Sequence, residues 1–549
     1  MSETSKKVPV NSQNNENYHL GHLFRDSMLK DPDAVCQVDA ATGEEETRRS
    51  VFTRATTLAR CLRTLGLRPG DVLALGGDNH LDLHIPFYAA LMNGYPITGV
   101  YTLYEFDEIK QLFKQLEPKI VFCQQSSYQD YRRAVEELGL DTRIVTFDGS
   151  GNTMAELIRQ HHASDQSIDD FQVADFVTDK VFAFAVATSG STGYPKLAAI
   201  KHQPLVKLIN MFTAEYTSKT LKPALNLSAM QWVSAYYNAI CMPAQNKIKV
   251  QTSAPATIAH VIDIINKYRV SHDCHEKGRL KLERDPIETT SPPSMLRRIL
   301  RDEKHCDLTC FDTIILTGSC IQKDLLLDLK AALRPDAVVV EAYGQTECLG
   351  PVLRLAPEGP LGNCGVETPR MKLKLVDPVT GDKITEPNVP GELWTKGPRF
   401  TEYYNNPVET ANAITPDGWY KTGDLLRRDE NGFFFFVERL KMLIKFRSYY
   451  VIPMELEEVI LKHDGVLEAC VTSIEHPEDK EWPVAVVVRK PGATVTAQEL
   501  QDLVASKLSE HKQLRGGVVF ADELPMTSNG KVAKAKVKQL VWETQQLGV

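Results

Sequence analysis

The chain has 549 residues, of which 63 are basic and 71 acidic, so its formal net charge at pH 7 is −8. A hydrophobic share of 43% and a charged share of 24% are typical of globular proteins and exclude fibrous and disordered classes. At ~150 residues per domain, this length predicts three or four structural units. The slightly acidic balance argues against a nucleic-acid partner, because nucleic-acid binders need a basic surface.

The cysteines and the N-terminal residues bear on the compartment. Eleven cysteines are scattered along the chain, at a density far below that of small disulfide-stabilised domains. Residues 1–17 are polar, which predicts a disordered tail and argues against a secretory signal. No window approaches the ~18 apolar residues that a transmembrane helix needs. We therefore expect a protein of a reducing compartment without a transmembrane segment.

Helical and strand patterns alternate after the tail, which predicts an α/β fold of mostly parallel sheets covered by helices. Helices are expected over 52–65 and 105–116, where apolar residues recur at helical spacing. Short apolar runs predict strands at 71–75, 119–123, 181–187, 313–317, 337–341, 432–437 and 484–488.

Two stretches depart from this alternation. Residues 272–286 are polar and charged and lie between two helical patterns, which predicts an exposed insertion. Charged residues also gather at 439–441, after an apolar strand and before a segment of mixed α and β pattern. The predicted organisation is therefore a large domain over 18–438 and a small C-terminal domain over 439–549.

The segment 188–196, TSGSTGYPK, directly follows an apolar strand pattern. Its two glycines and small hydroxyl side chains let backbone N–H groups approach a polyanion, and Lys196 adds a positive charge. It is not a Walker sequence, because no Gly-Lys-Ser/Thr occurs in it. A flexible turn is the plainer interpretation of a generic glycine-rich loop, but this string is much more specific.

The string resembles the phosphate loop of the adenylate-forming superfamily, which includes acyl-CoA synthetases, 4-coumarate–CoA ligases, beetle luciferases and peptide-synthetase adenylation domains. Four similar motifs follow in the family's order: EAYGQTE at 341–347, GWYKTGDL at 418–425, ERLKMLIK at 438–445 and TSNGK at 527–531. The chain looks most like insect luciferase-like acyl-CoA synthetases. This implies an α/β N-terminal AMP-binding domain with a small β-barrel-like subdomain, and a small mobile α+β C-terminal domain.

The resemblance also implies how the motif residues activate a carboxylic acid with ATP. Thr346 would contact the α-phosphate, and Glu347 would help to hold Mg²⁺. Lys531 would act in adenylation, and Lys445 would act in thioester formation after the small domain rotates about the hinge Lys441. The remaining residues would bind ATP or AMP: Thr188, Ser189, Gly190, Ser191, Thr192, Gly193 and Lys196 at the phosphates, Gly318, Ser319, Tyr343 and Gly344 near adenine, and Asp424 and Arg439 at the ribose.

Each of these residues has a plainer structural interpretation when it is taken alone. Asp424 could cap a turn, Glu347 could cap a helix, and Tyr343 could be a core aromatic residue. Lys531 after Asn-Gly could be an ordinary hairpin lysine. The occurrence of all five motifs in the family's order favours the functional interpretation.

The motifs say less about which acid is activated and about how well the acyl group is transferred to CoA. Trp232 occupies the segment where luciferases and coumarate ligases carry a histidine, and in similar fatty acyl-CoA synthetases an aromatic residue there gates the acyl tunnel. A core tryptophan is an equally good interpretation. The chain departs from the family pattern at Glu438, Ser448 and Tyr450, and bulk near the thiol tunnel could slow the CoA step without affecting adenylation.

The predicted function is that of an ATP-dependent acid–thiol ligase, which forms acyl-AMP from a carboxylic acid, expected to be a fatty acid, and transfers the acyl group to CoA. ATP, Mg²⁺ and CoA are the expected cofactors and cosubstrates. A luciferase-like monooxygenase that uses the adenylate, and an adenylation-only or weakly active homologue, remain alternatives. The expected location is the cytoplasm; family resemblance keeps the peroxisome open, although the C-terminus is not of the Ser-Lys-Leu type.

Overall fold

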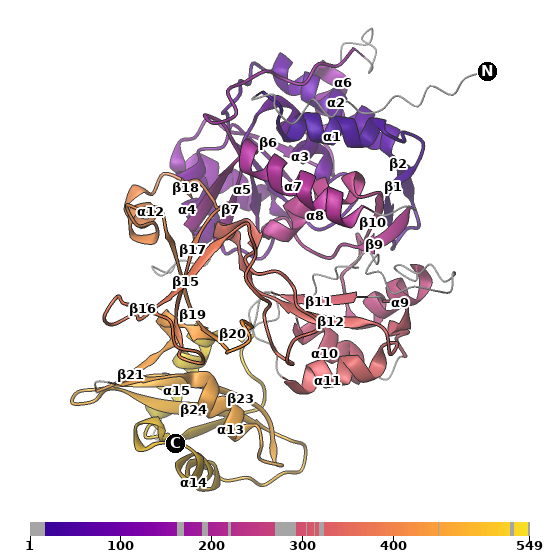
Figure 1. Ribbon diagram of the computed structural model, residues 1–549. Coiled ribbons are helices and arrows are strands. Elements are labelled where there is room, and N and C mark those ends of the chain that lie inside the picture. Colours follow the sequence, from indigo (N-terminus) through magenta and orange to yellow (C-terminus); the bar gives the residue numbers. More distant parts are fainter. Residues whose placement is uncertain are drawn as a thin grey trace.

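The computed structural model describes residues 17–161, 170–188, 196–217, 221–268, 293–302, 305–311, 313–317, 323–447, 449–526 and 532–546. Within these ranges the chain forms a large α/β part followed by a small C-terminal α+β part, which confirms the predicted fold class. Figure 1 shows the N-terminal helices at one end of the molecule and the C-terminal sheet at the other.

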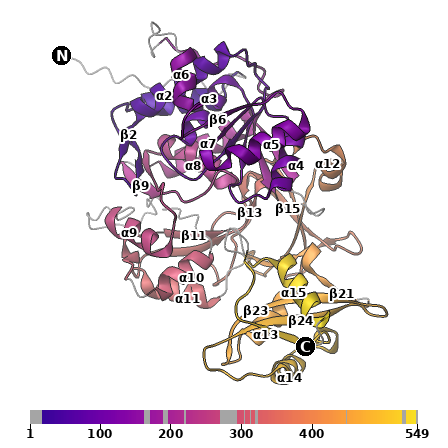
Figure 2. The same ribbon diagram turned by 180° about the vertical axis from the view of Figure 1, so that it is seen from behind.

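The largest sheet has seven strands, and its middle strands are short apolar runs that are completely buried. Five neighbouring strands run parallel, the next strand is antiparallel to them, and the edge strand beside it is antiparallel to that one. A parallel sheet needs helices on its faces, and the view from behind shows α4 (Phe106–Leu116) and α5 (Tyr128–Leu138) on one of them (Figure 2). The strand order is β18 (Glu402–Tyr403), β8 (Lys196–Lys201), β7 (Phe182–Thr188), β4 (Ile97–Val100), β3 (Leu73–Gly76), β5 (Ile120–Cys123) and β6 (Arg143–Thr146).

Two further sheets complete the α/β part. One has the order β2 (Glu45–Thr47), β1 (Val35–Asp39), β10 (Lys247–Gln251) and β9 (Lys222–Leu225). The other pairs β11 (Thr313–Thr317) with β12 (Val338–Ala342) in parallel, and its core includes residues of three helices. These are α9 (Ile258–Tyr268), α10 (Pro293–Arg301) and α11 (Lys323–Ala332).

The helices of the α/β part follow the predicted spacing, with one shifted start. α4 buries one apolar face, and Glu105 and Glu108 form a capping box at its beginning. α2 (Arg48–Thr64) begins before the predicted residue 52, because the Thr47 hydroxyl accepts a hydrogen bond from the Ser50 N–H at 3.2 Å and caps the helix there. The other helices are α1 (Leu20–Leu29), α3 (His84–Asn93), α6 (Met154–His161), α7 (His202–Tyr216) and α8 (Val233–Ala244).

An antiparallel five-stranded sheet lies between the α/β part and the C-terminal sheet in Figure 1. Its order is β16 (Lys383–Ile384), β15 (Lys372–Val376), β17 (Gly391–Lys396), β19 (Tyr420–Arg428) and β20 (Phe434–Arg439). The short helix α12 (Pro407–Ala413) precedes β19.

The C-terminal part has its own sheet and its own apolar core. The strand order is β22 (Tyr449–Val451), β21 (Ile444–Phe446), β24 (Lys480–Arg489) and β23 (Val466–His476), with β25 (Val518–Ala521) beside β24. Its helices are α13 (Pro453–Ile460), α14 (Ala497–Lys507) and α15 (Lys534–Gln546). The Lys534 Nζ lies 3.4 Å from the Glu438 Oε2, so a charged contact joins α15 to the end of β20.

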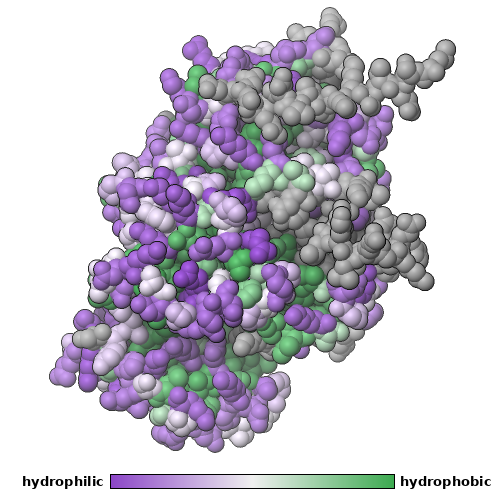
Figure 3. All heavy atoms as spheres, in the orientation of Figure 1, coloured by the Kyte–Doolittle hydropathy of each residue, from purple (hydrophilic) through white to green (hydrophobic). Residues whose placement is uncertain are grey.

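All the predicted strands are present; β11 has the predicted bounds, and the ends of the other predicted strands differ by a few residues. The predicted insertion at 272–286 and most of the tail lie outside the described residues. Within the described ranges, no helix is both long and apolar enough to span a bilayer. Hydrophilic residues cover most of the face in Figure 3, with smaller apolar areas among them.

Candidate active site

A hydrogen-bonded corner forms where β12 ends beside the five-stranded sheet. Tyr343 follows β12, and its hydroxyl donates a hydrogen bond to the Asp424 Oδ2 at 3.0 Å. The Gln345 amide nitrogen donates to the same oxygen at 2.5 Å and to the Thr422 carbonyl at 3.0 Å. Arg439 is the strand partner of Asp424, and its Nε lies 3.2 Å from the Asp424 Oδ1. Three side chains are therefore held around the Asp424 carboxylate, and together with it they come from three motifs.

Burial controls the ionisation of this corner. Asp424 is 2% exposed, and burial raises its pKa while the Arg439 guanidinium opposes that rise. Burial, and next the Asp424 charge, raise the pKa of Tyr343 well above its usual value, so the phenol remains protonated and donates. Within the described residues, the Asp424 Oδ1 accepts no hydrogen bond although it is buried. Its charged contact there is the ion pair with Arg439.

Gly344 allows two short strands of the corner to approach each other closely. It begins β13 (Gly344–Gln345), which pairs closely with β14 (Gly350–Pro351). A Cβ atom at Gly344 would lie 2.4 Å from the Gly350 carbonyl oxygen, so a larger residue would push the two strands apart. The glycine keeps Tyr343 and the following turn in place.

Glu347 lies in that turn, the short 3-10 helix η4 (Thr346–Cys348). Its carboxylate is buried and accepts a hydrogen bond from the Tyr403 hydroxyl through Oε1 at 3.0 Å. Its backbone carbonyl accepts a hydrogen bond from the Phe400 N–H at 2.8 Å. Among the described residues, no group of three or more His, Cys, Asp and Glu side chains is placed to hold a metal ion. A cation at Glu347 would need further oxygen ligands from a substrate and from water, which is the usual arrangement for Mg²⁺.

Lys196 is the first residue of β8 and pairs with Thr188 at the end of β7, so the described ends of the glycine-rich segment lie side by side. The Lys196 ammonium forms an ion pair with Glu409 of α12 and lies 5.1 Å from the centre of the Tyr403 ring. Tyr403 therefore contacts both Lys196 and Glu347. Nothing in the sequence around Glu409 or Tyr403 marked them, because their contacts join segments far apart in the chain.

The hinge candidate Lys441 lies close to this region. It belongs to the short 3-10 helix η5 (Leu440–Met442), which directly follows β20. Desolvation lowers the pKa of Lys441, and the nearby positive charges of Arg439 and Lys196 lower it further. Positive charge from Arg439 and Lys196 thus reaches Lys441, and the Asp424 carboxylate partly offsets it there.

Lys445 is placed differently. It is exposed on β21, and its backbone N–H donates a hydrogen bond to the Glu481 Oε2 at 2.7 Å within the C-terminal part. The remaining predicted residues lie outside the described part of the chain. They are Ser189, Gly190, Ser191, Thr192, Gly193, Gly318, Ser319 and Lys531.

Trp232 immediately precedes α8 and is 37% exposed, which does not fit the interpretation as a core tryptophan. Further along α8, the Tyr237 ring lies 3.9 Å from the position that a Cβ on Gly350 would take. The Tyr237 hydroxyl is buried and has no hydrogen-bond partner within the described ranges. α8 therefore faces the β13–β14 turn that carries Thr346 and Glu347.

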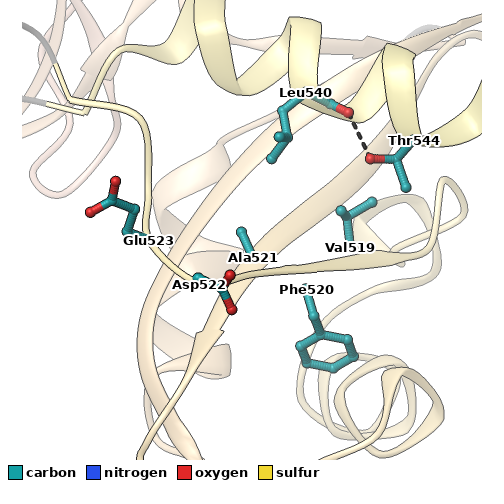
Figure 4. Close-up of a pocket in the computed structure, with 7 residues that line it drawn as sticks. All are labelled: Val519, Phe520, Ala521, Asp522, Glu523, Leu540 and Thr544. Carbon is teal, nitrogen blue, oxygen red and sulfur yellow. Dashed lines mark hydrogen bonds between the residues drawn. The ribbon is translucent and has the colours of Figure 1, made fainter.

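An open surface pocket of about 500 Å³ lies elsewhere, between β25 and α15 (Figure 4). Along one side of it, in α15, the Thr544 hydroxyl donates a hydrogen bond to the Leu540 carbonyl at 2.8 Å. None of the predicted site residues lines this pocket.

Comparison with known proteins identifies the family. Residues 24–275 and 279–405 match the model of the AMP-binding enzymes, and residues 455–531 match the model of the AMP-binding enzyme C-terminal domain. The chain belongs to the AMP-binding enzyme family. The predicted resemblance to adenylate-forming enzymes is thereby confirmed.

Curated relatives and solved structures agree with this assignment. The chain is 28% identical to a luciferin 4-monooxygenase of Photuris pensylvanica over 92% of both chains. It is 25% identical to the peroxisomal OPC-8:0-CoA ligase 1 of Arabidopsis thaliana, over 93% of this chain and 92% of the relative. ATP-bound MatB from Rhodopseudomonas palustris has the same fold, with a TM-score of 0.82, 22% identity, and coverage of 95% of this chain and 99% of MatB.

Proposed function

We propose that this enzyme of the adenylate-forming family activates a carboxylic acid with ATP, releasing pyrophosphate, and then transfers the acyl group from acyl-AMP to CoA. The observation that carries the proposal is the corner around Asp424, where Tyr343, Gln345 and Arg439 converge from separate motifs. The full-length similarity to CoA ligases supports the same reaction.

The geometry suits a nucleoside at this corner. The Asp424 carboxylate would accept hydrogen bonds from the ribose hydroxyls, and the Arg439 guanidinium beside it favours its ionised form. The Tyr343 ring, whose hydroxyl is bonded to Asp424, would stack on the adenine. Lys196 would bind the outer phosphates, and Thr346 the α-phosphate.

Two anions must meet before the acid attacks the α-phosphate, and their repulsion has to be offset by positive charge. Lys196, Arg439 and Lys441 supply such charge from the described residues. Mg²⁺, when bound through Glu347, would neutralise phosphate charge. Lys531, as the C-terminal lysine of the family pattern, would add the cation beside the reacting carboxylate.

The acid is proposed to be a fatty acid because Trp232 is an exposed aromatic residue at the start of α8, where it would close an acyl tunnel. Each buried methylene contributes ~0.8 kcal/mol, so kcat/KM should rise several-fold per carbon across short acids until the tunnel is full. Trp232→Ala should flatten that rise or move its plateau to longer chains. A hydroxycinnamate preferred over every fatty acid would remove this part of the proposal and leave the adenylation chemistry intact.

One experiment tests the whole reaction. Pyrophosphate release is measured with the purified chain over a series of fatty and aryl acids, with and without CoA, and thioester formation is followed in parallel. We expect release that depends on the acid, and CoA consumption in equal amount. Release without CoA consumption would indicate an adenylation-only enzyme, and no acid-dependent release would contradict the proposal.

A luciferase-like monooxygenase is the second candidate, because luciferin 4-monooxygenases are among the relatives with full-length similarity. Light emission with luciferin, ATP and oxygen would favour it over the ligase. Position 232 carries a tryptophan and not a histidine, which argues against the monooxygenase. A cytoplasmic location also remains a proposal that localisation of the tagged protein would test.

A further inference from the structure

Glu409 is an acidic residue at a place where the proposed reaction needs positive charge. It lies in the first turn of α12, where the Asn406 side chain accepts a hydrogen bond from its N–H at 3.2 Å. This cap fixes the helix start and directs the Glu409 side chain to β8. There the carboxylate forms an ion pair with Lys196.

The pair is largely shielded from water, since the Lys196 side chain is 16% exposed and that of Glu409 is 23% exposed. Lys196 also lies over the Tyr403 ring, and the Tyr403 hydroxyl is bonded to Glu347. The charges therefore belong to a connected group that runs from α12 through Lys196 to η4. Shielded charges interact more strongly than exposed ones, so the pair influences whatever binds at Lys196.

A bound triphosphate would change this pair. If Lys196 turned toward the phosphates, its contact with Glu409 would be lost. If Lys196 stayed, the Glu409 carboxylate would stand beside further negative charge. Both arrangements raise the free energy of the nucleotide complex relative to a chain without an acid at this position.

We propose that Glu409 holds Lys196 in the nucleotide-free enzyme and yields it to the phosphates, so that it weakens the binding of ATP and of pyrophosphate alike. The inference rests on the proposed function, in which Lys196 binds the outer phosphates. Weaker binding of the product is useful to such an enzyme, because pyrophosphate has to leave before the acyl group is transferred. Binding that is equally strong before and after the chemical step does not raise kcat.

The test uses Glu409→Gln, which removes the charge and keeps the size, with Glu409→Ala as a second variant. The matched control is Glu358→Gln, which also removes a carboxylate opposite an arginine but does so on the surface. The dissociation constant of ATP is measured by calorimetry without acid, and pyrophosphate is measured as a product inhibitor. We expect both Glu409 variants to bind ATP and pyrophosphate about three- to tenfold more tightly, as expected for loss of a shielded charge pair, and the control to match the wild type.

A double-mutant cycle separates this inference from the proposed function. Lys196→Met should weaken ATP binding, and in that background Glu409→Gln should have less than about a twofold effect, because its influence passes through the lysine. If Lys196→Met alone leaves ATP binding unchanged, the role of Lys196 in the proposed function fails, and this inference fails with it. If Lys196→Met weakens binding but Glu409→Gln weakens it too, or tightens it equally in both backgrounds, only the inference about Glu409 is overturned.

Discussion

The corner around Asp424 and the hairpin that carries Lys445 present their polar side chains in opposite ways. Asp424 and Tyr343 are buried and hydrogen-bonded to each other. Lys445 is exposed on β21, whose hairpin partner β22 carries Tyr449 and Tyr450, both exposed as well. Under the proposed function, the first arrangement would bind the nucleotide as it stands, and the second would act on the acyl-adenylate only after the C-terminal part has moved.

The hairpin is nevertheless fixed within the C-terminal part. Arg447 has a left-handed φ of 51° and is held there by an ion pair between its Nε and the Asp479 Oδ1 at 2.6 Å. The Tyr449 ring stacks on the His511 ring at 4.5 Å. A hairpin anchored in this way would move as a unit with its domain, which fits a rotation about Lys441 between the two half-reactions.

The largest effect is expected from Lys531→Ala, which tests whether the C-terminal part serves adenylation at all. Loss of the cation beside two reacting anions should slow adenylation by on the order of 10²–10³-fold. Thioester formation from supplied acyl-adenylate should be preserved, because that step no longer involves the triphosphate. Equal loss in both assays would contradict the division of labour between the two lysines.

Lys445→Ala tests whether the exposed hairpin serves only the transfer to CoA. If the exposed hairpin acts only after rotation, this variant should slow CoA transfer by about 10–100-fold while pyrophosphate release keeps its rate. Single-turnover assays of each half-reaction provide the measurement. Lys480→Ala removes an exposed lysine of the same sheet and is the control. Impaired adenylation in Lys445→Ala would show that the hairpin already contributes before any rotation.

Asp424→Ala tests whether the buried corner binds the nucleotide. Loss of the charged acceptor for the ribose hydroxyls should raise the KM for ATP by about tenfold or more. Tyr343→Phe keeps the ring and removes only the hydroxyl that donates to Asp424, so its effect should be smaller. An unchanged KM for ATP in a folded Asp424→Ala variant would reduce Asp424 to a turn residue.

The sequence predicted this corner better than it predicted the contacts of Lys196. Apolar runs gave the buried strands, and the family motifs gave Tyr343, Asp424 and Arg439. Gln345 could have been predicted as a site residue, because it lies inside the EAYGQTE motif. Glu409 and Tyr403 were not, because an ion pair and a ring contact formed by the tertiary fold leave no periodicity or spacing in the sequence.

The smallest expected effect concerns Glu341, a buried carboxyl on β12 in the same motif. It is 9% exposed, and burial raises its pKa from 4.5 to about 8. The unfolded chain releases this proton near pH 4.5, whereas the folded chain keeps it until about pH 8. Between these values the folded state binds more protons, so the contribution of Glu341 to stability is complete below pH 4.5 and is lost as the pH rises through 8.

Glu341→Gln removes this titration while preserving the size of the side chain. The difference in Tm between the variant and the wild type should therefore shift in favour of the variant by about 2–5 °C from pH 5 to pH 8.5. Glu358→Gln, on an exposed carboxyl, should show no such drift and serves as the control. Parallel Tm curves for Glu341→Gln and the wild type across this range would show that the carboxyl is better solvated, or better paired, than its burial indicates. The corner around Asp424 should keep its ATP affinity in either case, because its hydrogen bonds come from Tyr343 and Gln345 and not from Glu341.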